Sequence, residues 1–160
     1  MFIIFMGVAG VGKTTVGKLL AQELGWRFYE GDEFHPAGNI EKMRRGQPLT
    51  DTDRRSWLDA LRAVIQAALE NNENGILACS ALKRHYRARL RVNEDVVFVQ
   101  LAATPDVIRR RLEHRKGHFM NPSLLENQLA TLETPQSALS LDASLPPAVL
   151  VQQVRQALHI

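Results

Sequence analysis

Cysteine, aromatic residues and excess charge are all scarce in this sequence. A single cysteine, Cys79, excludes an internal disulfide and a cysteine-ligated metal cluster, and it suits a reducing compartment. Aromatic residues make up 6% of the 160 residues and hydrophobic residues 45%, so we expect a core of leucine, valine, isoleucine and alanine. The net charge of +3 is too small to favour nucleic-acid binding, although it allows a local pocket for anionic ligands.

Long apolar segments are absent as well. No hydrophobic run approaches the length of a membrane span, and the N-terminal MFIIFM lacks the basic region and cleavage site of a signal peptide. We therefore expect a cytoplasmic protein with neither a membrane nor a nucleic-acid partner. The length predicts one domain, residues 1–160, and no repeat or linker divides it.

Short apolar runs alternate with longer helical patterns along the chain. Strands are expected at 2–6, 26–29, 75–79, 96–101 and, more weakly, 138–142. Helices are expected at 13–24, 53–70 and 83–91, after Thr104-Pro105, after Asn121-Pro122, and from Pro147 onward. This alternation predicts a three-layer α/β fold, with a central parallel sheet of about five strands and helices on both faces. The polar segment at about 112–125 is expected to form a small lid.

One stretch near the N-terminus carries the clearest functional signal. Residues 7–14, GVAGVGKT, match the phosphate-loop pattern G-x-x-x-x-G-K-[ST] between an expected strand and an expected helix. Glycines let such a loop turn its backbone N–H groups toward phosphates, and the helix N-terminus favours their negative charge. We expect Lys13 to reach the β- and γ-phosphates and the Thr14 hydroxyl to ligate Mg²⁺. The predicted ATP-binding residues here are Gly7, Val8, Ala9, Gly10, Val11, Gly12, Lys13, Thr14 and Thr15.

The phosphate loop predicts a nucleoside triphosphate but leaves the reaction open. Small-molecule kinases, GTPase switches and ATP-driven binding or motor proteins all use such a loop. The guanine-reading sequence N-K-x-D is absent, which disfavours a GTPase. Motor proteins usually carry paired acids at the end of a hydrophobic strand, whereas here the third and fourth strands end in Cys79-Ser80 and Leu101-Ala102. The short chain therefore favours a compact phosphotransferase.

Acidic and imidazole groups follow the second expected strand, in EGDEFHPAGN at residues 30–39. Ligands of an open parallel sheet bind at the carboxyl ends of its strands, so we expect Asp32 near the γ-phosphate. A carboxylate there can accept or orient the proton of an acceptor hydroxyl, or hold Mg²⁺ through water, and the sequence leaves these roles open. His35 is a candidate hydrogen-bond donor to the acceptor. Glu30 and Glu33 are more typical of solvated acids.

Basic residues follow in three groups, each of which fits either a solvated face or an anion pocket. Arginine is the side chain best suited to bind a carboxylate with two hydrogen bonds. An arginine on a lid can also neutralise charge on the transferring phosphoryl group. The groups are Arg44, Arg45, Arg54 and Arg55 on either side of a turn, then Lys83 and Arg87 (with the hydroxyl of Ser80) after the third strand, then Arg111 and Arg115 one helical turn apart.

With these motifs the chain resembles the gluconate kinases (gluconokinases), P-loop kinases related to the shikimate kinases. Besides GVAGVGKT, the resemblance rests on residues 31–58 (GDEFHPAGNIEKMRRGQPLTDTDRRSWL), 79–91 (CSALKRHYRARLR) and 111–135 (RLEHRKGHFMNPSLLENQLATLETP). It implies a nucleoside-monophosphate-kinase-like fold and transfer of a phosphoryl group from ATP, with Mg²⁺, to the 6-hydroxyl of D-gluconate. It also implies a homodimer and a role in gluconate use, feeding the pentose phosphate or Entner–Doudoroff routes.

The resemblance also implies roles for single residues. Asp32 and Lys13 are the expected catalytic residues, Thr14 the expected Mg²⁺ ligand, and Asp32 a second metal contact through water. The expected substrate contacts are Asp32, His35, Arg54, Lys83, Arg87 and His118. The expected lid residues are Arg111, Arg115 and His118, and of these Arg111 and Arg115 are also expected to bind ATP. Glu30 stands where many members have Asp, so the resemblance assigns it no metal role, and Ser56 stands where Pro is common. The alternatives are a shikimate-type or other sugar-acid kinase, and a nucleotide-binding regulator without phosphotransfer.

Overall fold

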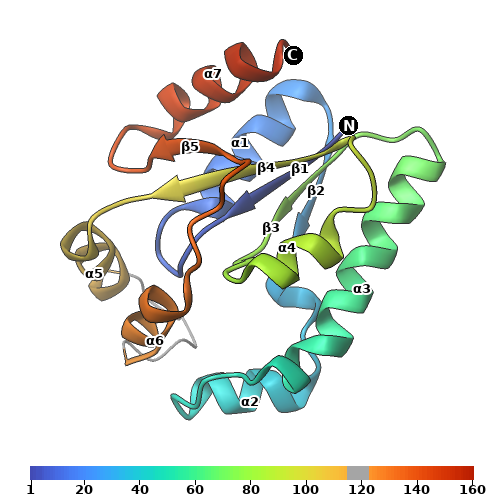
Figure 1. Cartoon of the computed structure of the whole chain (residues 1–160). Helices are drawn as coiled ribbons and strands as arrows, with labels where there is room; N and C mark the ends of the chain where they lie inside the picture. The colour runs from blue at the N-terminus through green and yellow to red at the C-terminus, as the bar shows by residue number, and fades with distance from the viewer. Residues whose placement is uncertain (115–122) are drawn as a thin grey trace.

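The chain folds around a five-stranded parallel sheet, as a computed structural model shows for residues 1–114 and 123–160 (Figure 1). The strands are β1 (Phe2–Met6), β2 (Arg27–Glu30), β3 (Gly75–Ala78), β4 (Val96–Ala102) and β5 (Leu139–Asp142). They lie in the order β2-β3-β1-β4-β5, with β1 paired to β3 on one side and to β4 on the other. The direction of winding thus reverses beside β1, and such a reversal opens a ligand-binding crevice at the carboxyl ends of the strands.

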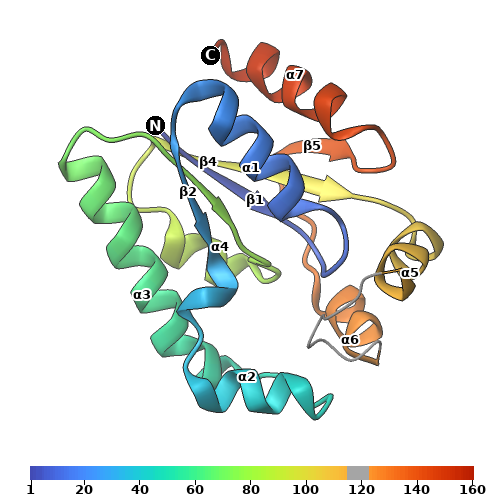
Figure 2. The ribbon, with the colours of Figure 1, turned by 180° about the vertical axis from the view of Figure 1, so that it is seen from behind.

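Helices cover both faces of this sheet, and Figure 2 shows α1 and α7 on the face opposite α3 and α4. Successive side chains of β1 point to opposite faces, so Ile3 and Phe5 pack in one hydrophobic cluster and Phe2, Ile4 and Met6 in the other. All five are fully buried, which explains why this strand is a continuous apolar run rather than an alternating one. The helices are α1 (Lys13–Leu24), α2 (Ala37–Arg44), α3 (Asp51–Glu70), α4 (Arg84–Leu90), α5 (Pro105–Glu113), α6 (Ser123–Thr131) and α7 (Pro147–Leu158).

Two helices begin with caps that the sequence encodes. The Thr50 side chain accepts a hydrogen bond from the Asp53 N–H, and the Asp53 carboxylate accepts one from the Thr50 N–H, so a capping box starts α3. Thr104 Oγ1 accepts from the Val107 N–H, and Pro105 occupies the first turn of α5, as expected. The capped N-terminal ends of α3 and α5 lie at the carboxyl end of the sheet, where α2 and α6 also lie (Figures 1 and 2).

The predicted fold class is confirmed, and the departures from the predicted elements are local. The second strand is residues 27–30 rather than 26–29, and the long helix begins at Asp51 rather than residue 53 because Thr50 caps it. No helix or strand was predicted for residues 31–44, and they form the 3₁₀ turn η1 (Gly31–Phe34) and helix α2. Of the expected lid at 112–125, residues 115–122 lie outside the described part of the chain, and these include the expected helix start at Asn121-Pro122.

None of the helices described for residues 1–114 and 123–160 has both the length and the apolar character that a membrane span requires.

Candidate active site

The phosphate loop joins β1 to α1 at the centre of the sheet edge. Gly12 precedes the first residue of α1 with φ 107°, a left-handed conformation that side chains other than glycine rarely adopt. Lys13 Nζ donates hydrogen bonds to the Gly7 and Val8 carbonyl oxygens, both at 3.0 Å, so the lysine folds back over its own loop. The Gly7 N–H donates to the Ser80 carbonyl at 3.2 Å, which ties the loop to the segment after β3. The structure thus places the predicted cradle, residues 7–15, where β1, β3 and α1 meet.

Thr14, the predicted metal ligand, has a carboxylate partner that the sequence did not single out. Its hydroxyl donates to Glu30 Oε2 at 2.7 Å from the first turn of α1. Burial raises the pKa of Glu30, the hydrogen bond from Thr14 opposes that rise, and the Asp32 carboxylate adds to it. A hydroxyl, Glu30 and Asp32 at the mouth of a phosphate loop are hard oxygen groups of the kind Mg²⁺ prefers alongside nucleotide phosphates.

A cleft of about 380 Å³ extends from the phosphate loop toward the end of β5. Arg111 at the end of α5 spans it, donating from Nη1 to the Val11 carbonyl at 3.1 Å and from Nη2 to the Ala143 carbonyl at 2.6 Å. Arg111, which was expected to contact the ATP phosphates, therefore lies against the phosphate loop. The cleft is lined by Gly10, Val11, Gly12, Thr15, Val16, Arg111, His114, Ala143, Leu145, Pro147 and Leu150.

On the other side of the loop, η1 carries Asp32 directly after β2. A Cβ on Gly31 would lie 2.5 Å from the Ala78 carbonyl oxygen, so only glycine lets β2 turn this closely over the end of β3. The Trp57 indole N–H donates to the Gly31 carbonyl at 2.7 Å and fixes the same turn from α3. Asp32 is half-buried, and its charge influences the pKa of Glu30, His35 and Cys79. The structure therefore brings Asp32 beside the phosphate loop, as predicted.

His35 is held between two helices rather than on a solvated turn. Its ring stacks on Trp57 with centroids 4.4 Å apart and planes 9° from parallel, and the residue is 8% exposed. Burial lowers the pKa of His35 to about 4, with Asp32 raising it and Arg54 lowering it further. The imidazole is therefore neutral at physiological pH.

Arg54, one turn before Trp57 in α3, is held by aromatic rings. Its guanidinium carbon lies 5.8 Å from the centre of the Trp57 ring and 5.6 Å from that of Tyr86. Among the described residues no carboxylate forms an ion pair with Arg54. Contacts of this kind with aromatic rings leave the N–H groups of a guanidinium available for the two parallel hydrogen bonds with which arginine binds a carboxylate.

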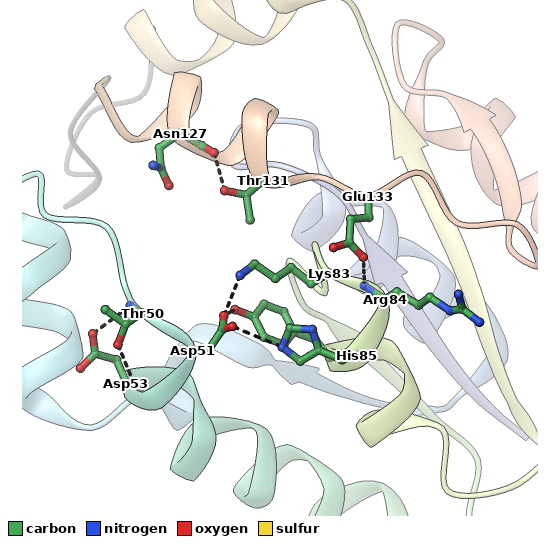
Figure 3. Close-up of polar contacts among 10 residues, drawn as sticks. Thr50, Asp51, Asp53, Lys83, Arg84, His85, Asn127, Thr131 and Glu133 are labelled. Atoms are coloured by element: carbon green, nitrogen blue, oxygen red, sulfur yellow. Dashed lines mark hydrogen bonds and ion pairs between the residues drawn. The ribbon is translucent and has the colours of Figure 1, made fainter.

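Lys83 is held by an acid at the start of α3 (Figure 3). Asp51 Oδ1 accepts from Lys83 Nζ at 2.8 Å and from the Tyr86 hydroxyl, and Oδ2 lies 3.7 Å from His85 Nε2. The hydrogen bonds from Lys83 and Tyr86 lower the pKa of Asp51, while burial and Asp51 raise the pKa of Tyr86. Asp51 thus joins α3 to α4 and sets the position of Lys83.

The remaining predicted site residues fall into two groups. Arg87 is buried in α4, and its Nη1 donates to the Ala81 and Leu82 carbonyls, both at 2.9 Å, so part of this guanidinium supports the loop after β3. Arg115 and His118 lie outside the described residues.

Sequence reasoning missed several groups that shape the site. Gln128 on α6 accepts a hydrogen bond from the Ala9 N–H at 2.7 Å, and Asn39 on α2 contacts both His35 and α3. A polar residue inside a short helix gives no local signal, because its partners come from distant parts of the chain. The cleft residues in 143–147 could have been predicted, because they follow the carboxyl end of a strand. The same position relative to a strand led to the prediction of Asp32.

Two negative findings limit the chemistry of the described residues. In residues 1–114 and 123–160, no three His, Cys, Asp or Glu side chains gather into a group that could hold a metal ion by themselves. Cys79 is 1% exposed, and burial raises the pKa of its thiol to about 12, so it is no nucleophile.

A parallel sheet, a phosphate loop after its central strand and polar groups at the adjacent strand ends define a P-loop kinase. The family model for shikimate kinase matches residues 9–144. A curated gluconokinase from Gluconobacter oxydans is 43% identical over 157 residues, which cover 96% of this chain and 88% of that protein. The chain therefore belongs to the gluconokinase family, within the wider group that the shikimate kinase model describes.

Solved structures agree with this assignment. A crystal structure of a sugar kinase from Janibacter sp. has a TM-score of 0.94 and 43% identity, covering 99% of this chain and 94% of that one. A crystal structure of a gluconokinase from Sinorhizobium meliloti has a TM-score of 0.84 and 39% identity, covering 98% of this chain and 94% of that one. The described fold is thus that of close relatives over nearly its whole length.

Proposed function

We propose that this protein phosphorylates D-gluconate at its 6-hydroxyl with ATP, giving 6-phospho-D-gluconate and ADP. The observation that carries the proposal is a complete phosphate loop at the same end of the sheet as Asp32 and as Arg54, which pairs with no carboxylate among the described residues. Gluconate is a polyol with its carboxylate at one end and its 6-hydroxyl at the other. A site for it therefore needs a group that accepts the hydroxyl proton and, at a distance from that group, a cation for the carboxylate. Relatives named gluconokinase at about 40% identity support the same substrate.

In the proposed reaction, the 6-hydroxyl oxygen attacks the γ-phosphorus of ATP. As the new P–O bond forms, the bond from the γ-phosphorus to the β,γ-bridging oxygen breaks, ADP leaves and the hydroxyl proton passes to Asp32. Lys13 and Arg111 balance the charge on the phosphates, and Arg54 with Lys83 binds the gluconate carboxylate. Most of the acceleration then comes from positioning and charge neutralisation, because phosphoryl transfer needs little covalent help from the protein.

Mg²⁺ and the nucleoside are assigned to opposite ends of the phosphate loop. The Thr14 hydroxyl would hold Mg²⁺ directly, and Glu30 and Asp32 would hold it through water; the ion would supply positive charge that neutralises the phosphates. The cleft between the loop and residues 143–147 would take the adenosine, with Arg111 at its border.

We further propose that residues 1–160 form one kinase domain, with the segment 112–125 as its lid and Arg115 and His118 on it. A lid would exclude water, which otherwise competes with gluconate for the γ-phosphoryl group. The resemblance to gluconokinases supports a cytoplasmic homodimer. Light scattering behind a sizing column would give the mass, and a monomer at micromolar concentration would reject the dimer.

A coupled ADP-release assay tests the proposed substrate. With gluconate, shikimate and related sugar acids each at saturating ATP and Mg²⁺, we expect the highest kcat/KM for gluconate. Because a shikimate kinase model matches the chain, shikimate is the decisive competitor. Preferred turnover of shikimate would overturn the gluconate assignment, and ATP binding without turnover of any acid would instead support a regulator.

A further inference from the structure

Asn39 is a buried polar residue to which the proposed chemistry gives no role. It lies in α2, is 6% exposed, and its Nδ2 donates to the Asp53 main-chain carbonyl of α3 at 2.8 Å. The same nitrogen lies 3.3 Å from Nδ1 of His35. A buried amide that contacts both the next helix and an acceptor-side histidine is placed to control that histidine.

The contact with Asp53 determines which way the Asn39 amide faces. A carbonyl oxygen only accepts hydrogen bonds, so the amide must turn its NH₂ group, and not its oxygen, toward it. The NH₂ group carries two hydrogens, which leaves the second for His35 Nδ1, 3.3 Å from the amide nitrogen. Nδ1 must therefore be the acceptor nitrogen of the ring, because an N–H there would oppose the amide N–H.

A neutral imidazole with an acceptor at Nδ1 carries its hydrogen on Nε2. Burial against Trp57 keeps the ring neutral, in agreement with its lowered pKa. No described residue bonds to Nε2. Since no buried side-chain nitrogen or oxygen among the described residues lacks a partner, Nε2 is reached by solvent.

We propose that Asn39 is a positioning residue that fixes His35 as the Nε2–H tautomer, so that His35 presents one permanent donor to the acceptor substrate. This inference deepens the proposed function and rests on it for the identity of the substrate. The charged groups that act on the ring are Asp32 and Arg54, both assigned to the acceptor side. An acceptor-only carboxylate and a donor-only N–H together select hydroxyl groups, which can donate to one and accept from the other. An ammonium group has no lone pair for His35.

The tautomer can be measured without any substrate. Long-range ¹H–¹⁵N correlation spectra of the ¹⁵N-labelled full chain at pH 7.5 distinguish a protonated from an unprotonated ring nitrogen. We expect the His35 signals to show a hydrogen on Nε2 alone, and in Asn39→Asp, whose carboxylate cannot donate to Nδ1, a shift toward Nδ1–H. An Nδ1–H ring or an even mixture in the wild-type protein would overturn the proposal, whether or not the variant folds.

Two His35 variants test the substrate contact. Glutamine places an amide N–H near the position of Nε2, whereas asparagine places one near Nδ1. We expect His35→Gln to keep a kcat/KM for gluconate about 10-fold higher than His35→Asn, the difference being in KM, with the KM for ATP equal in both. Equal values, or a better asparagine variant, would overturn the contact. If the wild-type protein turned over shikimate and not gluconate, the proposed function would fail while the tautomer result stood.

Discussion

The phosphate side of the site consists mainly of main-chain groups, whereas the acceptor side consists of side chains. On the phosphate side, residues 7–15, main-chain groups of one loop and one helix N-terminus do most of the work, and Lys13 closes on two carbonyls of its own loop. On the acceptor side, Asp32, His35, Arg54 and Lys83 come from three segments and depend on Trp57, Asn39 and Asp51 for their positions. A phosphate site made of main-chain groups from one loop tolerates substitutions around it. An acceptor site made of side chains changes its specificity when any residue that positions those side chains is replaced.

Removing Lys13 tests the phosphate side and should have the largest effect. In Lys13→Ala we expect kcat/KM to fall by about 10³-fold, because a positioned charge on the transferring phosphoryl group is lost. The coupled assay with gluconate, at varied ATP, measures it. Lys18→Ala is the control, since Lys18 is an exposed lysine of the same helix. Unchanged activity in Lys13→Ala would contradict the assignment of the phosphate loop.

Asp32→Asn separates the two sides. The amide cannot accept the hydroxyl proton, so we expect kcat to fall by on the order of 10²-fold or more while ATP affinity stays near that of the wild-type protein. Single-turnover assays and nucleotide titration measure the two quantities. Glu33→Gln, at the exposed next position, should stay close to wild type. Near-normal turnover in Asp32→Asn would remove Asp32 from the chemistry.

Arg54→Lys tests whether geometry on the acceptor side matters beyond charge. Lysine keeps the cation but cannot form two parallel hydrogen bonds to a carboxylate, so we expect the KM for gluconate to rise about 10-fold. The KM for ATP should not change. Arg55→Lys, at the exposed neighbouring residue, is the matched control. An equal rise in the two KM values would place Arg54 on both sides of the site.

The same contrast explains what the sequence could predict. The phosphate loop, the five strands and Asp32 follow from local patterns and from the rule that ligands bind at the ends of parallel strands. Glu30 was set aside as a solvated acid, yet its carboxylate accepts a hydrogen bond from Thr14, because β2 ends at the edge of the sheet where α1 begins. Asp51 precedes the helix that was expected from residue 53 and was given no role, and only the packing of α3 against α4 makes it the partner of Lys83. Contacts between side chains of distant elements require the register of the packed fold, which periodicity does not contain.

The smallest effect concerns the pH dependence of stability on the acceptor side. His35 has a pKa of about 4 in the folded chain and an ordinary value of 6.5 when unfolded, so the unfolded chain binds more protons between these values. Above about pH 6.5 the imidazole is neutral in both states, so its burial costs no free energy of protonation. As the pH drops toward 4, only the unfolded chain gains the proton, and the free energy of unfolding falls. From pH 7.5 to 5.5 we expect the wild-type protein to lose about 1 kcal/mol relative to His35→Gln, whose side chain does not titrate. Urea unfolding of both proteins at the two pH values measures this difference, in which the other titrating groups cancel. A constant difference would mean that His35 is not buried as a neutral ring, and the acceptor side would then lose its fixed donor.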